Sequence, residues 1–184
     1  MPSRALGIWD GDRVPRLALV DGQLASVADP RLTEENLRAF VVLLSAHFQG
    51  FCRDLYTEAA QVIASKVRKS LRLVVQDQFV AQLKLDRGNP TLANIFDDFG
   101  RLGFDAKVAL HAALGADAGW HHRLHNLNEW RNAVAHDLKA PKTPPLNVTS
   151  IRLWQDTCDR IARALDSIVY HGLQRLLRRT PWLA

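Results

Sequence analysis

The chain has 184 residues, of which 47% are hydrophobic and 23% charged, the profile of a globular protein with one real core. No apolar run approaches the ~20 residues of a membrane span, and the first residues lack the apolar stretch of a signal peptide, so we expect a cytoplasmic protein without membrane contact. The net charge of +5 permits a polyanionic partner without requiring one. Cys52 and Cys158 fall in apolar registers and are expected to be reduced core thiols.

Residues 1–32 differ in pattern from the rest of the chain. Asp-Gly pairs at 10–11 and 21–22 separate short β-prone runs, at 8–9, 17–20 and 24–27. Asp-Gly favours tight hairpin turns because both central residues of such a turn take positive φ. The pattern predicts a small β-meander or extended segment as an N-terminal appendage, in which Pro15 would confine its strand to a sheet edge.

Residues 33–184 are predicted to form a helical bundle. Thr33 suits an N-cap, and apolar side chains then recur at three- and four-residue steps to about residue 65. Further helices are expected near 70–85, 91–99, 105–114, 117–137 and 149–179, with breaks at the Gly-Asn-Pro of 88–90 and at a proline-rich loop. The predicted fold class is therefore all-α, a helical bundle with a short N-terminal β-segment.

The helix expected at 117–137 carries an arginine in its apolar stripe. The stripe recurs at steps of three and four, at Trp120, Leu124, Leu127, Val134 and Leu138. Arg131 occupies the step between Leu127 and Val134. Burying an unpaired guanidinium costs several kcal/mol, so Arg131 either pairs with a buried carboxylate or faces a groove where an anion binds. The residues alone leave both readings open.

A polar ridge lies beside Arg131 on the same helix, formed by His125, Glu129, Asn132 and His136. Asn132 and His136 are one turn apart, so the amide is expected to hydrogen-bond and orient the imidazole. His136 lies in the last turn, where the helix dipole favours an imidazolium. Histidine exchanges protons near neutral pH, and arginine offers a permanently charged fork to phosphate oxygens. This pair suits RNA cleavage without a metal. Residues five apart point about 140° away from each other on an ideal helix, which favours a site completed at a subunit interface.

Residues 131–136 read Arg-Asn-Ala-Val-Ala-His and match the Arg-Asn-x-x-x-His motif of HEPN domains, on a helix before a loop and a last long helix. Residues 44–55 resemble the opening helix of the RiboL-PSP-HEPN branch, and the whole resemblance spans roughly residues 33–179. It implies a metal-independent endoribonuclease, usually a homodimer with a composite active site, in toxin–antitoxin or antiphage defence. Its motif assigns the catalytic role to Arg131, Asn132 and His136. RNA, a second copy and an antitoxin or neighbouring defence protein are the implied partners, and no metal or cofactor is expected.

The match has one departure, and other functions stay open. One toxin branch of the family carries a tyrosine two residues after the histidine, where this chain has Leu138, so neutralisation by modifying that tyrosine is not implied. The main alternative is a catalytically silent helical module that binds a protein or nucleotide partner. A zinc face from His121, His125 and Glu129 is a weaker possibility, as is metal chemistry at Asp97-Asp98. A DNA-binding regulator is disfavoured, since the chain shows no short helix-turn-helix.

Basic residues gather in two places. One group is Lys66, Arg68, Lys69 and Arg72, and the other is Arg175, Arg178 and Arg179. Each group is either a solvated helix face or a patch that contacts the phosphate backbone of a nucleic acid.

Overall fold

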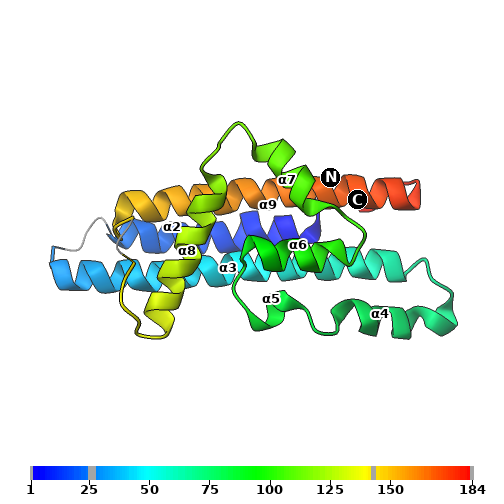
Figure 1. Cartoon of the computed structure of the whole chain (residues 1–184), viewed down its shortest axis with the longest axis horizontal. Coiled ribbons are helices and arrows are strands. Elements are labelled where there is room, and N and C mark those ends of the chain that lie inside the picture. Colours follow the sequence, from blue (N-terminus) through cyan, green and yellow to red (C-terminus); the bar gives the residue numbers. More distant parts are fainter. Residues whose placement is uncertain (1, 25–27, 142–143, 183–184) are drawn as a thin grey trace.

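The computed structural model describes residues 2–24, 28–141 and 144–182, and within these ranges it contains helices and no β-strand. Two long helices dominate, α3 (Pro30–Ala64) and α9 (Val148–Leu177). Figure 1 shows them side by side and running in the same direction, while α8 (Trp120–Ala135) crosses them steeply. The prediction of an all-α bundle is confirmed.

Shorter helices complete the bundle. The N-terminal segment consists of α1 (Arg4–Ile8), a π-helical turn η1 (Trp9–Arg13) and α2 (Val14–Leu24). The chain between the two long helices forms η2 (Lys69–Leu71, a 3-10 turn), α4 (Arg72–Val80), α5 (Lys84–Arg87), α6 (Leu92–Gly100) and α7 (Ala106–Leu114), followed by α8.

The predicted N-terminal β-meander is wrong for the described residues, because residues 4–24 are helical. A hairpin turn of the expected type needs positive φ at both central residues, and Gly103 is the only described glycine with positive φ. Neither Asp-Gly pair therefore forms a turn. Residues 25–27, which end the third predicted strand, lie outside the described part of the chain.

Tertiary contacts explain why this segment is helical. The two aspartates expected in turns pair instead with arginines of α9: Asp10 with Arg163 at 2.9 Å and Asp21 with Arg152 at 3.0 Å. Pro15 lies in the first turn of α2, directly after the π-helical turn, where a missing N–H is tolerated. The segment thus gains partners that a local pattern cannot reveal.

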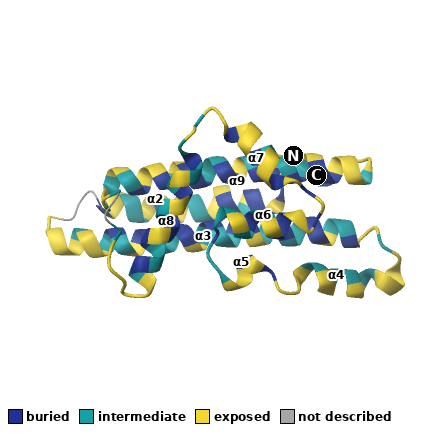
Figure 2. Cartoon of the chain, viewed as in Figure 1, coloured by how far each residue is buried: buried dark blue, intermediate teal, exposed yellow. Residues whose placement is uncertain are grey.

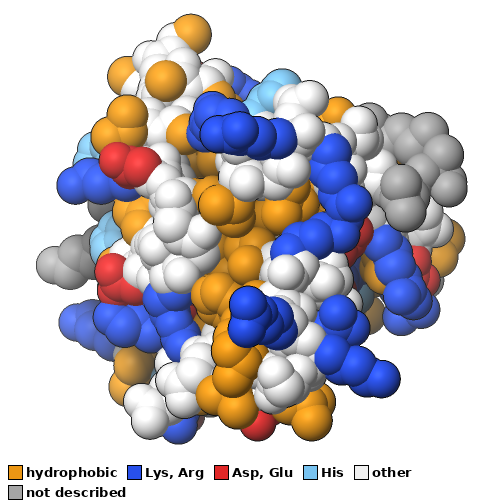
Figure 3. Space-filling view, turned by 90° about the vertical axis from the view of Figure 1, so that its right-hand side faces the viewer, with side chains coloured by type: hydrophobic (Ala, Val, Ile, Leu, Met, Phe, Trp, Pro, Cys, Tyr) orange, Lys and Arg blue, Asp and Glu red, His pale blue; other side chains and the backbone are white. Residues whose placement is uncertain are grey.

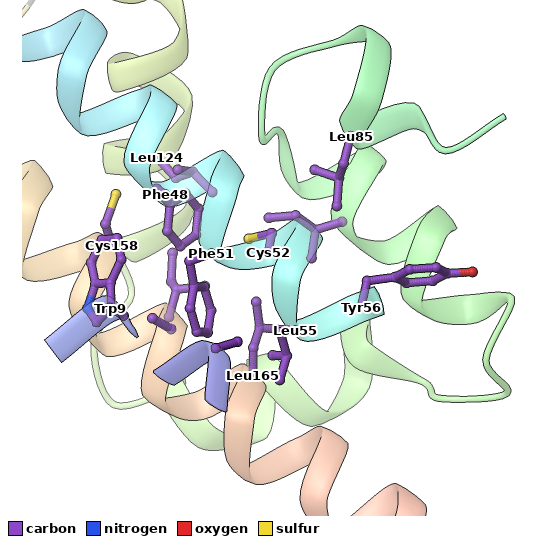
Figure 4. Close-up of a cluster of buried hydrophobic side chains, with 14 of the residues drawn as sticks. Trp9, Phe48, Phe51, Cys52, Leu55, Tyr56, Leu85, Leu124, Cys158 and Leu165 are labelled. Atoms are coloured by element: carbon purple, nitrogen blue, oxygen red, sulfur yellow. The ribbon is translucent and has the colours of Figure 1, made fainter. Parts of the chain in front are cut away.

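The N-terminal segment shares the core of the bundle through Trp9, which is fully buried. Its ring lies against Phe48 and Phe51 of α3, with centroids 6.2 and 5.7 Å away, and its Nε1 donates to Asp159 Oδ1 of α9 at 2.9 Å. Figure 4 shows this cluster, where the indole lies between the two long helices. Trp9 therefore joins the segment to both.

Two helix starts lie close to the predicted residues and have capping side chains. The side chains of Thr91 and Asp105 accept backbone N–H groups at the starts of α6 and α7, the helices expected at 91–99 and 105–114. The long helix begins one turn before Thr33, because the Asp29 side chain accepts from Arg31 N and Pro30 takes the first helical position.

The helix expected at 70–85 is interrupted. Gln82 takes positive φ between α4 and α5, and α4 contains no buried residue (Figure 2). Little apolar burial therefore stabilises α4.

Cys52 and Cys158 are buried and unpaired, as predicted for core thiols. Burial raises the pKa of both thiols above the usual range, which keeps them protonated and unreactive. None of the helices in the described ranges combines the length and apolarity needed to cross a bilayer.

Candidate active site

The buried face of α8 differs from the predicted stripe in its second half. Trp120, Leu124 and Leu127 are buried as predicted, but the next buried apolar positions are Trp130 and Ala133, and Asn128, which directly follows Leu127, is buried as well. The indole Nε1 of Trp130 donates to Pro144 O at 2.9 Å, which fixes the ring against the following loop.

Arg131 is consequently half-buried beside Trp130 and does not occupy a core position. Its guanidinium therefore needs no buried carboxylate, and the expectation of a charge in the core is wrong. In the described chain its one side-chain hydrogen bond is from Nη1 to Asn132 Oδ1, at 3.4 Å. The remaining N–H groups of the guanidinium are available to bind an anion.

His136 is the C-cap of α8, one residue beyond the last helical residue. Its backbone N–H donates to Asn132 O at 3.1 Å, and Asp137 then takes the left-handed conformation with φ of 50°. The backbone N–H of Leu138 donates to Ala133 O at 2.9 Å, which is the hydrogen bond of a Schellman motif at the helix C-terminus. The helix therefore ends before the predicted residue 137, and the His136 side chain is exposed to solvent.

Asn132 is held by the loop before α6. Its Oδ1 accepts from Asn89 Nδ2 at 2.6 Å, in addition to the bond from Arg131. Among the described residues no hydrogen bond joins the Asn132 amide to the His136 imidazole, so the expected orienting contact is absent from this geometry. The amide instead links Arg131 to Asn89.

Side-chain amides from three helices hold residues 88–90 in place by hydrogen bonds to their carbonyl groups. Gln49 of α3 donates to Gly88 O at 2.9 Å, Asn94 of α6 donates to Asn89 O at 2.8 Å, and Asn128 of α8 donates to Pro90 O at 3.4 Å. Sequence reasoning treated Gly-Asn-Pro only as a helix breaker and missed its role in positioning Asn132. The amide-rich positions around it were the available signal.

The structure brings Asn132 next to Arg131 and places His136 at the adjoining helix end, without a hydrogen bond between Arg131 and His136 in the described chain. The end of α8 lies near the start of α3, since the Asp137 carboxylate acts electrostatically on Arg38. The pKa of Arg38 is raised, chiefly by its hydrogen bond to Glu34. A charged network thus borders the helix end.

The weaker metal alternatives have other roles. Asp98 is buried and accepts from Lys84 N at 3.0 Å and Leu85 N at 2.9 Å, while Asp97 pairs with Lys84. In the described ranges no group of three or more His, Cys, Asp or Glu side chains is placed to hold a metal ion. The predicted zinc face of His121, His125 and Glu129 is therefore not formed.

Both basic groups lie at one end of the bundle, where α3 and α9 finish (Figure 1). Figure 3 views this end and shows Lys and Arg side chains around a central apolar strip, with few carboxylates. The site lies toward the other end: Arg38 and Ala64 are 26 residues apart on α3, about 39 Å at 1.5 Å per residue. The basic end is thus not part of the candidate site.

The fold and this site define an all-helical bundle protein with an arginine–asparagine–histidine run at the end of a crossing helix. Comparison with protein-family models, with curated proteins and with solved structures finds no match to the chain.

Proposed function

We propose that the protein is a metal-independent endoribonuclease of the HEPN type, acting on cytoplasmic RNA as a toxin or antiphage-defence effector. One observation carries the proposal: the Arg-Asn-Ala-Val-Ala-His run ends α8 with a half-buried guanidinium beside a fixed amide and an exposed imidazole at the C-cap. These are the groups that metal-free RNA cleavage uses.

In the proposed reaction the 2′-hydroxyl oxygen attacks the adjacent phosphorus and the bond to the 5′-oxygen breaks. The 2′-hydroxyl loses a proton to a base, and the 5′-oxygen gains one from an acid, leaving a 2′,3′-cyclic phosphate and a 5′-hydroxyl. His136 moves protons, and Arg131 stabilises charge on the phosphorane-like transition state. Asn132 positions the guanidinium through the bond that it accepts from Arg131.

The reaction is tested by incubating the purified protein with RNA in the presence of EDTA and identifying the product ends. Cleavage with 2′,3′-cyclic phosphate ends supports the proposal. Loss of cleavage with EDTA, or cleavage of a substrate carrying a 2′-deoxy group at the scissile position, contradicts it. Absence of cleavage together with tight binding of a protein partner would favour the silent helical module.

We expect a homodimer. Cleavage needs a base at one oxygen and an acid at another, and two subunits supply one His136 each to a shared cleft. Light scattering at micromolar concentration should give about twice the chain mass of 20.7 kDa. A monomer that cleaves RNA at the same concentration would contradict the composite site.

The basic end should supply affinity without sequence preference. Replacing Arg175, Arg178 and Arg179 by glutamine should weaken RNA binding and reduce the slope of log affinity against log salt by about 2, because each phosphate that a cation neutralises on a single strand contributes ~0.7 to that slope. The effect should be seen only for RNA long enough to span the ~39 Å along α3.

A charge-matched control removes three arginines that already pair with carboxylates, Arg16, Arg152 and Arg163. The control should leave the salt slope nearly unchanged. Equal slopes for the two triple variants would mean that the basic end is only a solvated surface.

A further inference from the structure

A pocket of about 340 Å³ lies between the start of α6 and the first half of α8. Its walls include Leu92 and Ala93 of α6 and the residues His121, His125 and Asn128 of α8. None of the three motif residues lines it. Asn128 is one turn before Asn132 on α8, about 6 Å along the axis, so the pocket adjoins the candidate active site. Its volume lies within the range of small-ligand sites.

One wall of the pocket carries unused backbone donors. Thr91 caps α6: its side chain accepts from Asn94 N at 3.2 Å and its carbonyl accepts from Ile95 N at 3.0 Å. In the described chain the N–H groups of Leu92 and Ala93 have no hydrogen-bond acceptor. Such donors at a helix start carry partial positive charge and bind anionic oxygens.

Asn128 supplies an unused hydrogen-bond acceptor to the same pocket. The residue is 3% exposed, and its Nδ2 donates to Leu124 O at 2.9 Å and to Pro90 O at 3.4 Å. These two carbonyls determine which end of the amide is nitrogen. The Oδ1 atom is then buried without a partner, a state that a ligand N–H or O–H would relieve.

Imidazole rings border the same pocket. The rings of His121 and His122 have centroids 4.2 Å apart, and both residues line the cavity. Their flat faces can stack on a planar ring, and their N–H groups can donate to an anion. The pocket therefore combines anion donors, one buried acceptor and aromatic faces.

We propose that this pocket binds one nucleotide of the RNA chain beside the scissile bond. The phosphate binds at the N–H groups of Leu92 and Ala93, an O–H or N–H of the nucleoside donates to Asn128 Oδ1, and the base lies against the imidazoles. A nucleotide is the unit of RNA that carries all three features. The inference rests on the proposed function in one respect: the nucleotide is taken to be part of the RNA substrate. The binding test itself does not depend on cleavage.

The backbone N–H of Leu92 can be removed selectively by substitution with proline. Proline is favoured at the first helical position, and Thr91, with φ of −70° and ψ of 155°, already has the extended backbone that a following proline requires. Leu92→Pro therefore deletes one N–H while keeping the helix. Leu92→Ala is the matched control, because it loses the same side-chain packing and keeps the N–H.

The experiment uses protein carrying His136→Ala, so that RNA stays intact, and titrates it with the four 5′-ribonucleoside monophosphates, a short oligoribonucleotide and inorganic phosphate. Oligonucleotide affinity should fall at least about fivefold in Leu92→Pro relative to Leu92→Ala. A similar fall is expected in His121→Ala/His122→Ala but not in His171→Ala, an exposed histidine on α9 outside the pocket. Thermal melting by circular dichroism checks that each variant is folded.

Three results would overturn the inference: equal affinity of all variants for the oligonucleotide, binding of inorganic phosphate as tight as that of the nucleotides, or binding of free nucleotides without binding of the oligonucleotide. Binding that follows the expected pattern while the native protein fails to cleave RNA would support the pocket and reject the ribonuclease. The two proposals therefore fail separately.

Discussion

Replacing His136 by alanine should lower the rate of RNA cleavage by about 10²–10⁴-fold, the usual contribution of a positioned acid–base group. The imidazole is exposed at the C-cap and makes no side-chain hydrogen bond in the described chain, so its removal leaves no buried partner unsatisfied. Folding stability should therefore change little. The measurement is the single-turnover rate on a labelled RNA in EDTA, with thermal melting on the same samples.

Three companion variants separate the roles of the motif residues. Arg131→Lys should cleave poorly because an ammonium cannot replace the bidentate fork. Asn132→Ala should give a smaller defect than loss of His136 or Arg131, and Asn89→Ala should reproduce it, since the Asn89 amide donates to Asn132 Oδ1 at 2.6 Å. His171→Ala serves as the control histidine variant. Cleavage that persists undiminished in His136→Ala would rule out the proposed mechanism.

Replacing Trp9 by alanine should lower the free energy of unfolding of the whole bundle by about 3–5 kcal/mol, the cost of truncating a buried tryptophan. The ring is fully buried against Phe48 and Phe51, and its loss also removes the hydrogen bond to Asp159. The midpoint of denaturant unfolding, followed by circular dichroism, measures the change.

A matched control lies in the same segment. Leu19 is 72% exposed on α2, and Leu19→Ala should change stability by no more than about 0.5 kcal/mol. If the N-terminal segment were only an appendage, the Trp9→Ala and Leu19→Ala variants would both unfold with the same midpoint as the native protein.

Local chemistry made much of the helical part predictable. Apolar residues at three- and four-residue steps have a periodicity that only a helix satisfies, and they mark α3 and α9 over most of their length. The starts of α6 and α7 were predicted within one residue, and the side chains of Thr91 and Asp105 cap these helices by accepting free N–H groups of the first turn. The Arg131, Asn132 and His136 run was likewise visible as a pattern on one helix.

The position of the helix end and the surroundings of the motif were not predictable from that pattern. A strict stripe places Arg131 in the core, whereas Trp130 is buried there because its ring packs toward the proline loop and donates to Pro144 O. The bond from Asn89 to Asn132 joins residues 43 apart in the chain, and no local periodicity reports such a contact.

The sequence by itself thus determined the all-α class and the approximate bounds of α3, α6, α7 and α9, because helix period and capping act over one or two turns. Only the tertiary structure decided the N-terminal segment. Asp-Gly favours a hairpin when considered alone, but the buried ring of Trp9 and the ion pairs of Asp10 and Asp21 with α9 stabilise a helix there. Contacts between residues about 150 apart outweigh a local preference for a turn, which is why pattern reasoning predicted strands where the chain forms helices.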